Sequence, residues 1–164
     1  MKKEDFRISK TKASLYRTLK ELMKDNNFED IKISDICNKS NINRSTFYDH
    51  YKDKNKLLNS IINDKEQELR ESINSNELPE IIKVLLNDIE NNYDLYKSII
   101  KITGNSMIQD MMIKLIYEST PYKDKYQNIF YASGIVNTII YYLDDKETFD
   151  KKELLRIINK IIKK

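Results

Sequence analysis

The chain has 164 residues, of which 40% are hydrophobic and 34% charged, and its formal net charge is only +3. This length suits one domain or a small module joined to another, and two glycines, two prolines and no tryptophan favour a soluble, all-α chain. A single cysteine, Cys37, excludes an internal disulfide, and a single histidine, His50, argues against a metal-ligand cluster, so no metal or cofactor is expected.

The positive charge is concentrated at the front of the chain. Residues 1–52 carry 12 lysines and arginines against 8 acidic residues, whereas the rest of the chain carries 17 against 18. The first residues contain no apolar run typical of a secretory signal. The longest mostly apolar stretch, 129–143, is shorter than the roughly 20 residues needed to cross a bilayer. We therefore expect a cytoplasmic protein without a membrane partner.

The apolar pattern at the front predicts three short helices. The first is expected to follow Ser9, a favourable N-cap residue, and to end at the polar residues 25–27. The second is expected at 34–40. After it, Asn41 is predicted to take the left-handed conformation that usually requires glycine.

The third helix has a clear start signal. With Asn43 as its N-cap, Ile42 and Phe47 occupy the two positions of a hydrophobic staple. Phe47 and Tyr51 are four residues apart and are therefore expected to share the buried face. The first turns of this helix are left polar and exposed.

The remainder of the chain predicts a longer helix after Asp53, followed by a helical bundle. The long helix is expected to end near residue 74, and Asp150 and Glu153 predict a capping box, with Phe149 and Leu154 as its staple. Further helices are expected at 79–91, 93–103, 106–118, 123–145 and 151–163, which makes about nine in all. The predicted division is a first domain at 1–52, a connecting helix at 53–74 and a C-terminal domain at 75–164.

Two short helices joined by a tight turn, with a polar second helix in a basic setting, are typical of a helix-turn-helix module. Such a module lays its second helix in the major groove of double-stranded DNA. Arg44 can donate paired hydrogen bonds to guanine, and Thr46 can contact a thymine methyl group or a phosphate. Tyr48 and Lys54 can each reach a phosphate.

Residues 28–58, FEDIKISDICNKSNINRSTFYDHYKDKNKLL, resemble the DNA-binding signature of the TetR family of bacterial transcriptional regulators. The resemblance is strongest to short members with an INRSTFY-type recognition helix, and it extends over residues 9–60. It implies that 34–40 is the second helix, that 44–51 is the recognition helix, and that Tyr48, His50 and Lys54 contact the DNA backbone. It also implies a homodimer that reads a palindromic operator and catalyses no reaction.

Lys32 stands where the family commonly has a threonine cap, so Ser34 is expected to cap the second helix instead. His50 could alternatively act with Asp49 in an enzyme. The absence of a second histidine and of a glycine-rich phosphate loop argues against that interpretation. The predicted DNA-binding residues are Arg44, Ser45, Thr46, Tyr48, His50, Lys54, Ser34 and Lys12.

The last two helices carry more apolar surface than one neighbour can cover. Two helices that each need two partners predict a four-helix interface across a two-fold axis. Residues 130–158 also resemble the C-terminal pattern of the short TetR members, in which the last two helices dimerise. A helix lying on a membrane surface is the alternative for the last helix. The predicted dimer residues are Ile135, Ile139, Tyr142, Ile158 and Ile162.

Tyrosines and methionines in the middle helices form either an ordinary core or the lining of a cavity for a small apolar or aromatic effector. The family resemblance implies an effector in many members. The candidate lining residues are Tyr93, Tyr96, Met107, Met111, Tyr117 and Tyr131. We therefore predict a homodimeric repressor that an effector releases from its operator, and the alternative is a TetR-like coactivator that acts through protein contacts.

Overall fold

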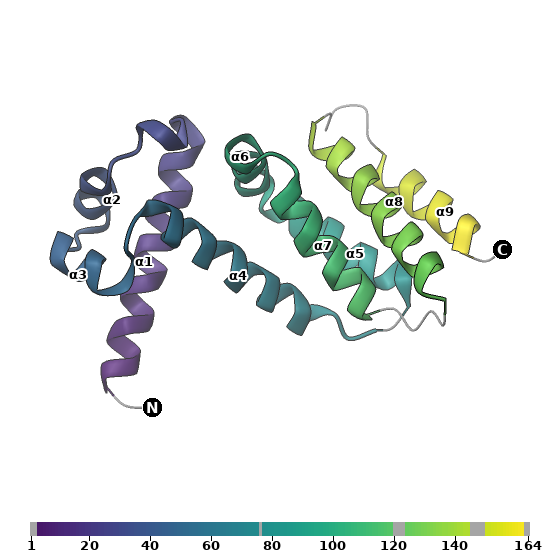
Figure 1. Ribbon diagram of the computed structural model, residues 1–164, viewed down its shortest axis with the longest axis horizontal. Coiled ribbons are helices and arrows are strands. Elements are labelled where there is room, and N and C mark those ends of the chain that lie inside the picture. The colour runs from purple at the N-terminus through teal and green to yellow at the C-terminus, as the bar shows by residue number, and fades with distance from the viewer. Residues whose placement is uncertain (1–2, 76, 120–123, 145–149, 163–164) are drawn as a thin grey trace. The chain divides into compact units, whose positions relative to one another are not determined.

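A computed structural model describes residues 3–75, 77–119, 124–144 and 150–162, with the backbone alone for 3–6, 142, 144, 161 and 162, and all regular structure in these ranges is helical (Figure 1). The predicted all-α class, with about nine helices, is confirmed. The elements are α1 (Lys3–Asp25), the 3₁₀ turn η1 (Phe28–Asp30), α2 (Ile33–Ser40), α3 (Arg44–His50), α4 (Lys54–Ser72), α5 (Leu78–Asn91), α6 (Tyr93–Thr103), α7 (Ser106–Ser119), α8 (Lys125–Asp144) and α9 (Lys151–Ile162).

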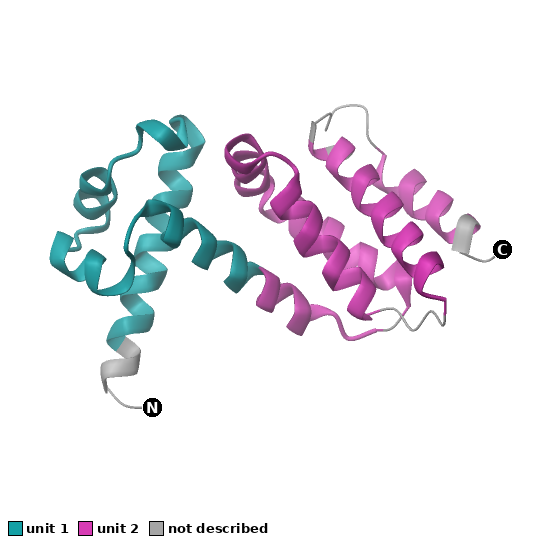
Figure 2. Cartoon of the chain, in the orientation of Figure 1, with its two compact units in different colours: residues 1–65 teal, residues 66–164 magenta. Residues whose placement is uncertain are grey.

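The chain forms two compact units, residues 1–65 and residues 66–164, which Figure 2 shows in teal and magenta. The division falls inside α4. No helix in the described ranges is long and apolar enough to cross a membrane.

The first unit is held together by a small core to which each of its four helices contributes. Leu15 of α1, Ile36 of α2, Phe47 of α3 and Leu57 of α4 are all fully buried. Such large apolar side chains each stabilise the fold by about 1.5–3 kcal/mol when they leave water. This core fixes α2 and α3 against α1, so it sets the face that α3 presents.

Hydroxyl groups tie the same helices together at the edge of this core. The Tyr51 hydroxyl, just after α3, donates to the Tyr16 hydroxyl of α1 over 3.4 Å. Tyr16 in turn shares a hydrogen bond with Ser60 of α4. Burial raises the pKa of Tyr16 well above its usual range, so the phenol stays protonated and can keep both bonds at physiological pH.

Two helix starts differ from the predictions. α1 begins at Lys3 and not after Ser9, because no glycine or proline interrupts residues 3–9 and nothing stops the helix from extending there. α2 begins at Ile33 with Lys32 at the N-cap position, and the Asp35 carboxylate accepts the Lys32 backbone N–H over 2.9 Å. Ser34 therefore lies inside the helix, and the predicted cap at Ser34 is wrong.

The turn after α2 agrees with its prediction. Asn41 has φ 54° and ψ 43°, which is the left-handed conformation expected for it. The backbone N–H of Ile42 donates to the carbonyl of Cys37 over 3.0 Å, a bond that satisfies one of the last carbonyls of α2. The tight turn therefore forms without glycine, and it leads directly into α3.

The second unit is a helical bundle built on α5, α6 and α7. α8 packs mainly against α7, and α9 packs against α5. The last turns of α4 join this unit through an ion network in which Glu66 accepts from Arg70 and from Lys114 of α7, and Arg70 also pairs with Glu118. The bundle is therefore held by apolar packing inside and by charges at one edge.

The start of α9 matches its sequence signal in part. The Asp150 carboxylate accepts the backbone N–H groups of Lys152 and Glu153 over 2.8 and 3.3 Å, so the predicted cap is confirmed. The side chain of Glu153 pairs with Arg156 in place of the reciprocal bond of a capping box. The staple residue Phe149 lies outside the described residues.

Candidate nucleic-acid interface

The recognition helix predicted from the sequence is α3, and its outward face is set by one anchor. Phe47 is fully buried, and its backbone N–H donates to the Asn43 carbonyl over 3.0 Å. Asn43 occupies the predicted N-cap position, although its side chain makes no capping hydrogen bond. Because Phe47 points inward, Arg44 and Ser45 are left exposed at the first turn of the helix, and Thr46 is half-buried beside them.

Tyr48 stands on the same outward surface. Its side chain is 49% exposed, while its ring packs edge-on against Phe47 with the ring centroids 5.6 Å apart. The ring is therefore held in place, and the hydroxyl remains available to a partner. A tyrosine whose ring is packed on one side and whose hydroxyl is exposed to solvent is well placed to donate a hydrogen bond to a phosphate.

The structure places Lys54 differently from the prediction. Its ammonium group donates to the backbone carbonyls of Phe28, Glu29 and Ile31 over 2.6, 2.8 and 3.0 Å. It also lies 4.7 Å from the centroid of the Phe28 ring. A lysine ammonium has three N–H donors, and all three are used here. In the absence of DNA this ammonium therefore has no free donor for the expected phosphate contact. Lys54 instead fastens the start of α4 to the connection between α1 and α2.

The first turn of α4 is capped by its neighbour Asp53. The Asp53 carboxylate accepts the backbone N–H of Lys56 over 2.8 Å, as the sequence predicted for an N-cap at this position. This bond occupies one of the free N–H groups of α4.

The remaining predicted DNA residues are His50, Ser34 and Lys12. His50 is half-buried at the end of α3, with its ring 6.3 Å from that of Tyr51. Ser34 bonds weakly to Asp35 over 3.5 Å, and Lys12 is half-buried on α1. No group of His, Cys, Asp and Glu in the described ranges could hold a metal ion.

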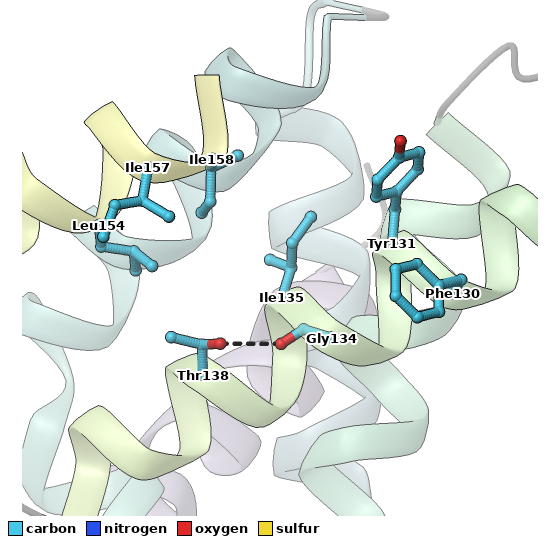
Figure 3. A pocket seen from close by; sticks show the side chains of 8 residues that line it. All are labelled: Phe130, Tyr131, Gly134, Ile135, Thr138, Leu154, Ile157 and Ile158. Carbon is cyan, nitrogen blue, oxygen red and sulfur yellow. Dashed lines mark hydrogen bonds between the residues drawn. The ribbon is translucent and has the colours of Figure 1, made fainter. Parts of the chain in front are cut away.

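A second surface lies on the last two helices. A groove of about 320 Å³ separates α8 from α9, and Figure 3 shows its lining side chains. The lining is almost entirely apolar, and the Thr138 hydroxyl is turned back to the Gly134 carbonyl over 2.9 Å. The lining residues are Phe130, Tyr131, Gly134, Ile135, Thr138, Leu154, Ile157 and Ile158.

The predicted dimer residues divide between this groove and the core. Ile135 and Ile158 line the groove, whereas Ile139 is fully buried inside the protomer and offers no surface to a partner, so its assignment to the interface is corrected. The physical reason is that other helices of the protomer already cover the face of α8 that carries Ile139, and α8 packs mainly against α7. The side chains of Tyr142 and Ile162 lie outside the described residues.

The sequence interpretation missed the apolar residues that α8 leaves in water. Tyr126, Phe130 and Tyr141 are 82%, 74% and 66% exposed, and they follow one another at helical spacing with Gly134 between them. This exposed stripe is readable as an i, i+4, i+8, i+15 pattern on one helix face. Periodicity alone cannot tell which of two apolar faces of a helix is covered within the protomer, so the predicted dimer residues of α8 do not include this stripe.

The predicted effector residues differ in burial and in their hydrogen bonds. Tyr96 is 1% exposed and donates its hydroxyl to Asp88 over 2.6 Å, and Met111 is also buried, so both belong to the core. The Tyr93 hydroxyl donates to the Leu143 carbonyl over 2.9 Å. Met107 is half-buried, Tyr117 is exposed, and Tyr131 lines the groove between α8 and α9.

A three-helix module with an exposed polar recognition helix, followed by a helical bundle, defines the helix-turn-helix class of proteins. Residues 15–61 match the family model of bacterial regulatory proteins, tetR family. The match covers this module and not the whole chain, and over the module it agrees with the resemblance stated from the sequence. The description of the matched model names regulatory proteins.

Comparison with known proteins gives the same module and the same fold. An uncharacterized HTH-type transcriptional regulator of Bacillus subtilis strain 168, YxbF, is 40% identical over 62 residues, which are 37% of this chain and only 16% of that relative. The crystal structure of a TetR transcriptional regulator from Streptococcus agalactiae 2603V superimposes with a TM-score of 0.73 over 97% of both chains, at 20% identity. The dihydroxyacetone kinase operon activator DhaS gives 0.69 over 93% of this chain and 92% of that one, at 19% identity.

Proposed function

We propose that the protein is a DNA-binding transcriptional regulator that binds a palindromic operator as a homodimer. The observation that carries this proposal is the face of α3, where Arg44, Ser45 and Tyr48 are exposed on a helix that Phe47 anchors in the core. Arginine can read guanine through two hydrogen bonds, and the tyrosine hydroxyl can fix the register on a phosphate. The tetR-family match over residues 15–61 supports the same conclusion.

The homodimer is supported by the apolar surface of the second unit. Phe130 of α8 and Ile157 of α9 are exposed large apolar residues that line the groove between the two helices, and Tyr126 and Tyr141 of α8 are also exposed. An apolar surface of this kind on a soluble chain marks an interaction site. A second copy that adds its own α8 and α9 would cover it across a two-fold axis and form a four-helix interface. Two recognition helices, about 34 Å apart, would then meet successive major grooves.

We further propose that the protein acts as a repressor and that a small apolar or aromatic effector releases it. An effector does this by binding better to a dimer whose recognition helices are not spaced for DNA. Of the predicted lining residues, four are at least partly accessible: Tyr93, Met107, Tyr117 and Tyr131. Residues at these positions should be substituted first in a test of effector binding.

Footprinting of the purified protein on the DNA upstream of its own gene tests the main proposal. We expect a protected palindrome of two half-sites, with an affinity that falls steeply as salt increases, because each neutralised phosphate adds about 0.9 to the slope. Transcription from that DNA in a purified system then distinguishes repression from activation. Failure to bind any duplex at low salt, together with tight binding to another regulator, would establish the coactivator alternative instead.

A further inference from the structure

We propose that the first turns of α1 form a cationic arm that contacts the DNA phosphate backbone beside the groove entered by α3. The arm consists of Arg7 and Lys10. The proposal rests on the proposed DNA-binding function and adds to it a contact surface outside the helix-turn-helix residues.

The first observation is that α1 continues past the point where the module ends. The helix begins at Lys3, six residues before Ser9, and residues 7–10 are all exposed. The family match begins only at residue 15, so the first turns of α1 lie outside the matched module. Because residues 7–10 are exposed, packing gives little reason for this part of the helix.

The second observation is the charge of the segment of α1 that lies between the acidic residues Glu4 and Asp5 at one end and Glu21 at the other. Residues 6–20 contain five lysines and arginines and no acidic residue. In the part of the chain that the structure describes, neither Arg7 nor Lys10 makes an ion pair. Unpaired cations of one sign along a helix attract a polyanion, and duplex DNA carries one negative charge per 1.7 Å of its axis, roughly.

The third observation places the arm next to the recognition helix. Arg7 and Lys10 precede Ser14 by seven and four residues, a spacing that puts all three on one face of α1. The Ser14 hydroxyl donates to the Ser40 carbonyl over 3.4 Å, at the turn that leads into α3. At a rise of 1.5 Å per residue, Lys10 and Arg7 extend this face by about 6 and 11 Å beyond that contact. The cations therefore follow the side of α1 that meets the α2–α3 turn.

The test compares salt dependence between an arm variant and a charge-matched control. The arm variant carries Arg7→Gln and Lys10→Gln. The control carries Lys83→Gln and Lys97→Gln, two exposed lysines of the second unit, so both variants lose the same charge. Binding to a labelled duplex of the upstream DNA, and to a random duplex of equal length, is measured by fluorescence anisotropy from low to high potassium chloride.

We expect the slope of log affinity against log salt to fall by about 0.9 for each arm substitution, on both duplexes, and to stay unchanged in the control. Arg7→Lys should retain the wild-type slope because it retains the charge. Circular dichroism should show unchanged helix content and melting temperature, since neither residue is buried. Equal slopes for wild type and the arm variant would overturn the arm while leaving the proposed function intact. Absence of salt-dependent DNA binding by the wild type would overturn both.

Discussion

The ammonium nitrogen of Lys54 lies 2.6 Å from the carbonyl oxygen of Phe28 and 4.7 Å from the centroid of its ring, so one lysine satisfies the backbone and covers the aromatic face of the same residue. The carbonyls of Glu29 and Ile31 accept hydrogen bonds from its other two N–H groups. Lys54 begins α4, and Phe28 begins the connection between α1 and α2. The lysine therefore positions the helix-turn-helix module against α4.

Replacing Lys54 by Met should destabilise the first unit. The substitution keeps most of the apolar stem and removes three charge-assisted hydrogen bonds, so we expect the free energy of unfolding to fall by about 2 kcal/mol. Lys56→Met is the matched control, because Lys56 is an exposed lysine in the same turn of α4, and its loss should change stability little. Urea unfolding followed by far-UV circular dichroism measures both variants.

DNA binding by the Lys54→Met variant distinguishes two roles for Lys54, which are to position the helix-turn-helix module and to contact a DNA phosphate. A residue that positions the module should leave the salt dependence of DNA binding at its wild-type slope. A slope lower by about 0.9, with unchanged stability, would mean that the ammonium leaves the carbonyls and neutralises a phosphate in the complex.

Arg44 and Tyr48 should separate base reading from backbone contact. Arg44→Ala should reduce the preference for operator over random duplex by about 1–3 kcal/mol, because a paired contact to guanine is lost. Tyr48→Phe removes only a hydroxyl and keeps the ring on Phe47, so it should weaken binding to both duplexes alike. Competition titrations against unlabelled DNA measure the ratio of the affinities for operator and random duplex. If Arg44→Ala weakened both duplexes equally, the arginine would be a backbone contact.

Local sequence signals predicted most of the fold. Asn41 took the left-handed turn, Asp53 and Asp150 capped their helices, and Phe47 was buried as its staple position required. These features depend on neighbours within a few residues, so the sequence contains them directly. Most helix boundaries follow for the same reason, and the exceptions are the starts of α1 and α2, which Ser9 and Ser34 do not cap.

The positions of individual side chains required the tertiary structure. Lys54 is bonded to residues 23–26 positions earlier in the chain, a distance over which no spacing rule applies. Likewise, the two apolar faces of α8 look alike in sequence, and only packing against α7 distinguishes Ile139 from the exposed Phe130. Charge and periodicity identify candidate surfaces, but which surface remains free depends on the assembled fold.

The ion network at the edge of the second unit predicts a pH dependence of stability. A hydrogen bond from Lys114, and a second from Arg70, lower the pKa of Glu66 below its ordinary value of 4.5. A carboxyl whose pKa is lowered by folding stabilises the fold above that ordinary value, and this contribution is lost as the pH falls through the pKa of the folded state.

We therefore expect Glu66→Gln to be less stable than the wild type at pH 7, by roughly 0.5–1 kcal/mol, and to lose less stability between pH 6 and pH 3. Urea unfolding at several pH values measures this difference. Glu71→Gln, an exposed position further along α4, is the control and should follow the wild type. If the unfolding free energies of Glu66→Gln and the wild type changed with pH in parallel, the ion network would not contribute to the pH dependence of stability.

Gly134 gives a test of the proposed dimer that a general loss of stability cannot imitate. It lies in the exposed stripe of α8, and a Cβ atom added there meets nothing within 4 Å in the protomer. Ala should therefore stabilise α8 by about 0.5–1 kcal/mol, because glycine is a poor helix former. If two copies of α8 approach each other closely at this glycine, the added methyl group should instead weaken the dimer.

We expect Gly134→Ala to have a higher melting temperature as a monomer and a dissociation constant for the dimer raised roughly tenfold, which corresponds to about 1.4 kcal/mol. Sedimentation equilibrium measures the second quantity. Phe130→Ser is the companion variant, since it removes a 74% exposed ring from the same stripe and should weaken the dimer at little cost to the protomer. An unchanged dimer for both variants would place the interface on another surface. A dimer strengthened by Gly134→Ala and weakened by Phe130→Ser would keep the stripe in the interface but show that the two helices do not come together at the glycine.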